Sequence, residues 1–314
     1  MKPDSFFHPD MQPLLEARKG MPPATTPAEM RRAWTLYAQA LAAPRPREIA
    51  TQDRTIPTPG HNVPVRIYHP PGATAPLPCI VYMHGGGFML GDLDSSDTSA
   101  WGLCLEVNAV VVSVDYRLTP EHPYPAAFDD CFGVLHWLSR HAAEIGGDPA
   151  RLAVSGESAG GNLAAALALA ARDRGGPALR ACAMVYPCTG EEATLPSYAE
   201  YKDGPSLTTP RMVMYTDTYC SGAKHRRDPY ASPACATDFS GLPPTFVHSA
   251  ECDPIRDDGR LYAAKIAQAG GNVTYREAKR MLHGFLRARL TGAAARAEHD
   301  ALCAFLRAQL HGAG

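Results

Sequence analysis

Short apolar runs alternate with helical patterns along most of this 314-residue chain, from about residue 79 onward. Each run has the length and the apolar character of a buried strand, and a segment with helical spacing of apolar positions separates it from the next. The alternation is typical of a mostly parallel sheet covered by helices on both faces. Strands are predicted at 79–83, 109–114, 152–154, 182–185, 245–248 and 272–275.

The clearest helical patterns lie at residues 126–143, 161–173, 257–269 and 293–310. Apolar residues recur there at helical spacing, and glycine or proline ends most of these segments. A hairpin is predicted at the edge of the sheet, because residues 63–68 alternate in polarity after a turn at Pro59-Gly60. These patterns together predict an α/β fold.

Two stretches fall outside the alternation. Residues 1–50 contain proline-rich breaks around one predicted helix at 27–43, for which Thr26 offers an N-cap. Residues 190–230 are rich in loops, with a second helix predicted at 209–219.

We expect these stretches to form a helical cap. The predicted division is an amino-terminal part of the cap at 1–50 and a catalytic domain at 51–314, in which 190–230 contributes to the cap. Open α/β sheets bind ligands at the carboxyl ends of their strands, so the cap is expected to shape a pocket there.

Composition and charge narrow the class of protein. Apolar residues make up 45% of the chain and charged residues 20%, which is near the average of globular proteins. A formal net charge of -2 offers no basic field for a phosphate backbone, so no nucleic-acid partner is expected. No apolar run is long enough to span a membrane, and the first residues lack the features of a signal peptide. A cytoplasmic location is the resulting expectation.

The nine cysteines show no C-x-x-C spacing. Cys79, Cys182 and Cys252 lie in apolar runs, where cysteine behaves as a small hydrophobic residue. We therefore expect reduced, buried thiols rather than disulfides or a zinc site.

The segment 156–160 reads G-x-S-x-G and stands between a predicted strand and a predicted helix. A serine on such a sharp turn has a strained backbone that exposes its hydroxyl at the carboxyl end of a sheet. Ser158 is therefore a candidate nucleophile.

A serine hydroxyl is a weak nucleophile and needs a base, which in turn needs an acid to orient it. Asp253 follows the strand at 245–248, and His283 follows the last predicted strand. Asp257 and Asp258 compete with Asp253, although they fall where a helix begins and could cap it. The chain order serine, aspartate, histidine is that of an α/β-hydrolase.

His84-Gly85-Gly86-Gly87 follows the strand at 79–83. Successive glycines let the backbone turn its N–H groups toward one point, as the oxyanion of a tetrahedral intermediate requires. The amide of Ala159, next after Ser158, would add a donor. A phosphate-binding loop is the rival interpretation, but the lysine of a P-loop and the later glycine of a dinucleotide site are missing.

With these residues assembled, the chain resembles the hormone-sensitive-lipase-like esterases, also called bacterial lipolytic family IV. The resemblance covers about residues 60–310 and rests on five motifs in the family's order, at 84–87, 115–127, 156–161, 253–257 and 283–285. It implies an α/β-hydrolase core with a mostly parallel sheet, an amino-terminal helical cap, hydrolysis of carboxylic esters, and no metal or organic cofactor.

Carried over by position, the resemblance implies Ser158 as nucleophile, His283 as general base and Asp253 as acid. It also implies an oxyanion hole made by the amides of Gly86, Gly87 and Ala159, with His84 and Gly85 supporting the loop. Glu157 departs from the aspartate or threonine of many relatives, and a helix-start or packing role is expected for it rather than acid catalysis. Phe88 and Leu90, next after the glycines, are candidates for the pocket mouth.

Three functions remain open at this point. The expected one is a serine carboxylesterase acting on short- to medium-chain esters, with a small-molecule ester as the partner. An amidase or formamidase would use the same triad, and a receptor would bind a small molecule in the same pocket without catalysis. The oligomeric state is open as well, with a homodimer through the last strand and helix as one arrangement.

Overall fold

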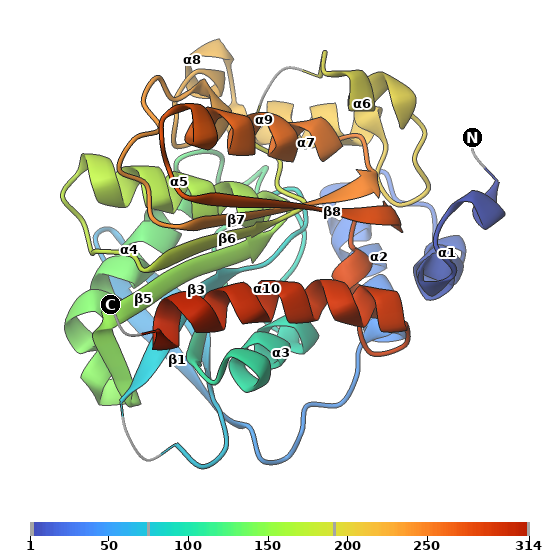
Figure 1. The fold of residues 1–314 in the computed structure, drawn as a ribbon. Helices are drawn as coiled ribbons and strands as arrows, with labels where there is room; N and C mark the ends of the chain where they lie inside the picture. The colour runs from blue at the N-terminus through green and yellow to red at the C-terminus, as the bar shows by residue number, and fades with distance from the viewer. Residues whose placement is uncertain (1–2, 74–75, 191–192, 313–314) are drawn as a thin grey trace.

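A single mixed sheet organises the chain (Figure 1). The computed structural model describes residues 3–73, 76–190 and 193–312, and within them eight strands pair in the order β1-β2-β4-β3-β5-β6-β7-β8. The strands are β1 (Ala50–Thr58), β2 (His61–His69), β3 (Leu77–Met83), β4 (Val110–Val114), β5 (Gly147–Glu157), β6 (Ala181–Val185), β7 (Thr245–Cys252) and β8 (Val273–Leu282).

Strands β3 to β8 run parallel, while β1 and β2 form an antiparallel hairpin whose β2 pairs with β4. This confirms the predicted α/β sheet and its edge hairpin. All seven residues of β3 are buried, as expected for a central strand covered on both faces. β8 lies at the edge of the sheet, so the dimer through the last strand and helix stays a prediction.

Helices cover both faces of the sheet. In Figure 1, α4, α5 and α9 lie on one side and α3 and α10 on the other. The helices are α1 (Gln12–Lys19), α2 (Pro27–Leu41), α3 (Asp97–Val107), α4 (Ala126–His141), α5 (Ala159–Asp173), α6 (Pro196–Glu200), α7 (Thr209–Cys220), α8 (Ala223–Arg226), α9 (Arg256–Gln268) and α10 (Ala293–His311). Short 3₁₀ turns occupy Asp4–Phe6, Pro9–Met11, Ala142–Ile145, Pro233–Cys235 and Phe285–Ala288.

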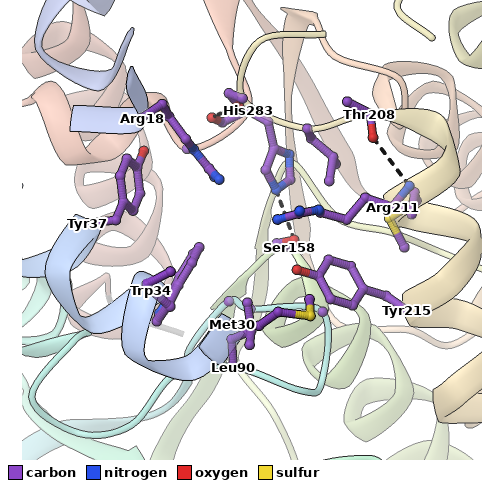
Figure 2. Close-up of a pocket in the computed structure, with 18 of the residues that line it drawn as sticks. Arg18, Met30, Trp34, Tyr37, Leu90, Ser158, Thr208, Arg211, Tyr215 and His283 are labelled. Carbon is purple, nitrogen blue, oxygen red and sulfur yellow. Dashed lines mark hydrogen bonds between the residues drawn. The ribbon is translucent and has the colours of Figure 1, made fainter. Parts of the chain in front are cut away.

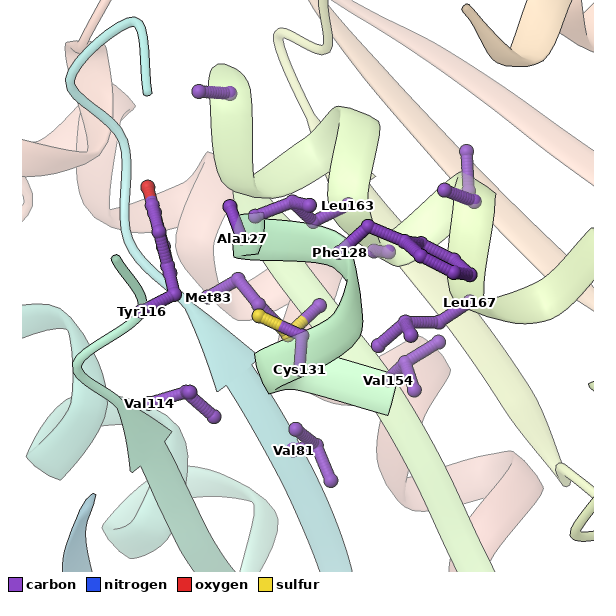
Figure 3. Packing of buried hydrophobic residues seen from close by; sticks show 14 of the residues in the cluster. Val81, Met83, Val114, Tyr116, Ala127, Phe128, Cys131, Val154, Leu163 and Leu167 are labelled. Carbon is purple, nitrogen blue, oxygen red and sulfur yellow. The ribbon is translucent and has the colours of Figure 1, made fainter. Parts of the chain in front are cut away.

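The core divides into two clusters, one on each face, because alternate residues of a strand point to opposite sides. Val81 and Met83 of β3 pack under α4 and α5, together with Phe128 and Leu163 (Figure 3). Ile80 and Tyr82 belong to the second cluster, which α3 and α10 complete. Helix α5 is buried along almost its whole length, so its alanines allow it to pack closely on β5 and β6.

Four helices were missing from the expectations: α1, α3 and the short helices α6 and α8. Residues 1–50 contain α1 as well as α2, so the expectation of one helix there was wrong. A proline at its second position and few apolar residues weakened the periodic signal of α1. Helix α3 is buried on most sides, and an amphipathic stripe is therefore absent from its sequence.

The cysteines form no disulfide in the part of the chain that the structure describes, and eight of the nine are buried. Burial raises the pKa of Cys79 and Cys182 to about 12, so their thiols stay protonated near neutral pH. The helices of the described ranges are all too short or too polar to cross a membrane.

An ion pair anchors the segment that follows β4 to helix α4. Asp130 is 1% exposed and accepts two hydrogen bonds from the Arg117 guanidinium, at 2.7 and 2.9 Å, and one from the Arg117 backbone N–H at 2.9 Å. A charged pair with this many hydrogen bonds is costly to break, because the remaining partner loses its acceptor while staying partly desolvated.

We predict that Asp130→Ala lowers the free energy of unfolding by about 3 kcal/mol, because Arg117 loses its acceptors. Urea denaturation measures the loss. Asp129→Ala is the matched control, since Asp129 is exposed on the same helix turn, and its effect should stay within about 0.5 kcal/mol. Equal effects of the two substitutions would contradict the structural role of the pair.

Candidate active site

Ser158 lies on a sharp turn between β5 and α5. Its backbone has φ 58° and ψ −117°, a conformation that non-glycine residues rarely adopt. The turn is possible because two glycines flank it. A Cβ on Gly156 would collide with the carbonyl of Gly160, and a Cβ on Gly160 would collide with the carbonyl of Met83. The backbones of β5, the turn and α5 are thus in direct contact, with no side chain between them. Ser158 follows the carboxyl end of β5.

Two hydrogen bonds link Ser158, His283 and Asp253 in that order. The Oγ of Ser158 lies 2.9 Å from Nε2 of His283, and Nδ1 of His283 lies 2.6 Å from Oδ2 of Asp253 (Figure 2 shows the first contact). Asp253 is fully buried, and its other oxygen accepts the Ile255 backbone N–H. The structure therefore brings together the three residues that the sequence predicted, in the geometry of a serine, a base and an orienting acid.

Asp257 and Asp258, the two aspartates that compete with Asp253, make their hydrogen bonds to residues outside the triad. Asp257 pairs with Arg256 and accepts the Ser197 backbone N–H, whereas Asp258 accepts the Tyr198 hydroxyl. Both hold α6 against α9. This leaves Asp253 as the carboxylate in contact with His283.

The glycine loop after β3 borders Ser158. Gly86 and Gly87 have φ 132° and 62°, and the Gly86 carbonyl accepts the N–H groups of Met89 and Leu90, which closes the loop. Within the described ranges, the amides of Gly86, Gly87 and Ala159 have no hydrogen-bond acceptor, and all three residues line the same cavity as Ser158. These N–H groups are therefore available to an oxygen atom bound beside the serine.

His84 and Gly85 hold that loop in place. The His84 ring stacks on Tyr116 with 4.2 Å between centroids, and its Nδ1 lies 2.9 Å from the Gly85 carbonyl. The Tyr116 hydroxyl donates to the His84 carbonyl at 2.7 Å. Burial lowers the pKa of His84, which keeps its ring neutral. Gly85 packs against Ser158, because a Cβ on it would lie 3.3 Å from the Ser158 Cβ.

A cavity of about 360 Å³ opens above Ser158. Its wall comes from the glycine loop, from α1, α2 and the loop between them, and from α7 with the loop before it (Figure 2). Leu90 lines the cavity as expected. Phe88 does not line it: its ring is 1% exposed and stacks on Tyr219 at 3.7 Å, so it is part of the core. The backbone of Phe88 has a positive φ of 60°, and its side chain lies in the core rather than in the cavity.

Glu157 has a larger role than the sequence indicated. It is 4% exposed, and its carboxylate accepts the Tyr186 hydroxyl at 2.5 Å and the Tyr82 hydroxyl. Burial on its own would raise the pKa of Glu157, but the Arg287 guanidinium and the two hydroxyls outweigh burial and lower it. An ionised carboxylate thus lies directly before Ser158 in the chain, at the end of β5. Its partners come from three other elements, so spacing along the chain could not reveal them.

No group of three or more histidine, cysteine, aspartate or glutamate side chains that could hold a metal ion occurs in the described part of the chain. The triad residues, the free amides and the cavity are the chemical features of the site.

The chain is similar in sequence and in fold to known proteins. Residues 80–287 match a family model described as the α/β hydrolase fold. The chain is 43% identical over 266 residues to carboxylesterase NlhH of Mycobacterium tuberculosis, an alignment that covers 83% of each protein. It is 37% identical over 233 residues to an ethyl acetate hydrolase of Pseudomonas putida, covering 73% of each. The crystal structure of a thermostable esterase from Pseudomonas putida ECU1011 superposes with a TM-score of 0.93 at 33% identity, over 98% of this chain and 99% of that chain.

We predict that Glu157→Gln destabilises the fold by about 3 kcal/mol near neutral pH, because Arg287 loses the opposing charge. The folded pKa of Glu157 lies below its ordinary value of 4.5, so its contribution is complete above that pH and is lost as pH falls through the folded pKa. The stability gap between the parent and the variant should therefore narrow below about pH 4.5.

Urea denaturation across this pH range measures the gap. Glu48→Gln, at an exposed glutamate, serves as the control and should show no pH-dependent gap. A gap for Glu157→Gln that stays constant into acid would show that the charge of Glu157 does not stabilise the fold.

Proposed function

The chain belongs to the α/β-hydrolase family, in its hormone-sensitive-lipase-like branch, and we propose that it is a serine carboxylesterase acting through an acyl-enzyme on Ser158. The observation that carries this proposal is the hydrogen-bonded relay from Ser158 through His283 to Asp253, which opens onto a cavity of about 360 Å³. Relatives named carboxylesterase and ethyl acetate hydrolase support carboxylic esters as the substrate class.

Acylation begins when the ester carbonyl lies over Ser158. The Oγ attacks the carbonyl carbon while its proton passes to Nε2 of His283, 2.9 Å away. Asp253 accepts the Nδ1–H of His283, which keeps Nε2 free as the base and stabilises the imidazolium that forms. The carbonyl electron pair moves onto the oxygen, which accepts hydrogen bonds from the amides of Gly86, Gly87 and Ala159.

The tetrahedral intermediate collapses when its C–O bond to the alcohol breaks. The leaving oxygen takes the proton from Nε2 of His283, and the alcohol departs. Water then attacks the acyl-serine, giving its proton to His283, and the second collapse returns that proton to the Ser158 oxygen. Atoms and protons balance with water as the only co-reactant, so the residues present are sufficient for the reaction.

The volume of the cavity, about 360 Å³, is at the small end of the range of ligand pockets. This volume supports a preference for esters with short to medium acyl chains. Residues 1–50 and 190–230 would act as its cap, since both contribute lining residues. An amidase would use the same relay, but the relatives' names favour esters. A non-catalytic receptor is disfavoured by a triad in hydrogen-bonding geometry.

We predict that Ser158→Ala lowers kcat for p-nitrophenyl acetate by roughly 10⁵–10⁶-fold, because the nucleophile is lost. Activity of the parent across the series from acetate to palmitate should peak at the short esters. Ser240→Ala, at an exposed serine, is the control for substitution as such.

An organophosphate should label the parent at Ser158 and leave the alanine variant unlabelled. Parent-level turnover in Ser158→Ala would refute the acyl-enzyme on this serine. Faster cleavage of the matched aryl amide than of the ester would instead favour the amidase.

Gly87→Ala should lower kcat/KM by about 100-fold or more, because a Cβ there meets the Tyr215 ring and shifts an oxyanion donor. Gly72→Ala is the matched control: Gly72 also has a positive φ, of 71°, but has open space around it. Thermal melting measures whether alanine at a positive φ lowers the melting temperature of the two variants by a similar amount. A similar loss of activity in both would argue against an oxyanion role for the Gly87 amide.

A further inference from the structure

The cavity above Ser158 is lined by more positive than negative side chains. Three arginines, Arg18, Arg211 and Arg287, share its wall with one carboxylate, that of Glu157. A pocket built only to hold an uncharged ester has no need of guanidinium groups, which are costly to desolvate.

The positive charge of Arg287 is balanced by neighbouring groups. Its charge opposes that of the buried Glu157, and its guanidinium lies over the rings of Trp34 and Tyr37 at 5.1 and 5.7 Å. It also donates to the Ser95 carbonyl at 3.2 Å. Arg287 therefore supports the floor of the site and carries no unbalanced charge.

Arg18 and Arg211 have no such balance. Both are half-buried, and neither forms an ion pair with a carboxylate among the described residues. The Arg18 guanidinium lies 4.4 Å above the Tyr37 ring, yet its Nε is buried and lacks a hydrogen-bond partner in the described part of the chain. Packing on Tyr37 explains the position of Arg18 but leaves this donor unsatisfied.

The two guanidinium groups approach the reaction site from separate segments. Figure 2 shows Arg211 extending from α7 across the cavity near Ser158, and Arg18 pointing from α1 into the same space. Both charges act on the Tyr215 hydroxyl: burial raises the pKa of Tyr215, and Arg211 and Arg18 oppose that rise. Helices that are distant in sequence thus direct two positive charges at one region of the cavity.

We propose that the natural substrate is an ester that carries a carboxylate on its acyl or its alcohol part, and that Arg18 and Arg211 bind this carboxylate. The inference rests on the proposed esterase function and specifies its substrate class. A guanidinium offers paired N–H donors that match a carboxylate, and the pair is stronger where water is excluded. The carboxylate would satisfy the unpaired Nε of Arg18 and offset one of the two unbalanced positive charges of the pocket.

The test compares charged esters with neutral esters of similar size, each with one ester bond. Monoethyl succinate against ethyl valerate places the carboxylate on the acyl side, and acetoxyacetate against propyl acetate places it on the alcohol side. We expect kcat/KM for the charged ester of at least one pair to exceed that for its neutral partner by about tenfold or more at low salt. The pair that shows the preference identifies the side of the substrate.

Arg18→Met and Arg211→Met should each lower the ratio of charged to neutral kcat/KM by about tenfold, and Arg211→Lys should fall between Arg211→Met and the parent. Arg32→Met is the matched control, because Arg32 is exposed and does not line the cavity. If a methionine variant does not fold, salt decides: about 0.5 M salt should reduce turnover of the charged ester several-fold more than that of the neutral one.

The failure of this inference differs from the failure of the proposed function. Cleavage of the neutral esters with no preference for either charged ester, or a preference that survives both methionine substitutions, would overturn the role of the two arginines and leave the esterase intact. Absence of all ester cleavage, or cleavage that persists in Ser158→Ala, would overturn the esterase and the substrate class together.

Discussion

The close contact between β5, α5 and the end of β3 is the constraint on which the rest of the site depends. Gly156, Gly160 and the Met83 carbonyl meet there without room for a Cβ. This contact forces Ser158 into its strained backbone conformation, and a strained residue persists only where its surroundings hold it. Because β3 is the neighbour of β5, the same contact brings the glycine loop that follows β3 beside the serine. The same backbone contact therefore positions both Ser158 and the amides of the glycine loop.

The order of the strands extends that arrangement to the other two triad residues. β6, β7 and β8 follow β5 across the sheet, and parallel strands end at the same edge. Asp253 follows β7, and His283 follows β8, so both side chains reach toward Ser158 from one side. The buried carboxylate of Glu157 also holds the turn through the Tyr82 and Tyr186 hydroxyls. The turn is thus held both by the close backbone contact at Gly156 and Gly160 and by the hydrogen bonds of Glu157.

The parts of the site that the sequence predicted are those encoded by local patterns and by chain order. Ser158 stands in a motif with its glycines, and Asp253 and His283 each follow a recognisable apolar strand. Helix α3 had no stripe to reveal it, because burial on most sides removes the polar face. Phe88 shows the limit of arguing from position: it is adjacent to the glycine loop, yet a positive φ sends its ring into the core against Tyr219. The environments of Glu157 and of the cavity arginines come from tertiary contacts between distant segments, which no local pattern encodes.

The hydrogen-bonded triad and the arginines that we propose to bind a carboxylate therefore come from different parts of the chain. The triad and the amides come from the sheet edge and its turns, where a change in backbone position would disturb the serine. Arg18 and Arg211 come from α1 and α7, which border the cavity without taking part in the contact at Gly156 and Gly160. A substitution on these helices can alter the charge of the cavity while the strained turn is untouched. Since Arg18 precedes the matched range 80–287, the charge of the pocket is set partly outside the segment that identifies the family. The matched segment thus holds Ser158, Asp253 and His283, whereas part of the charge that we propose to select the ester lies outside it, on α1.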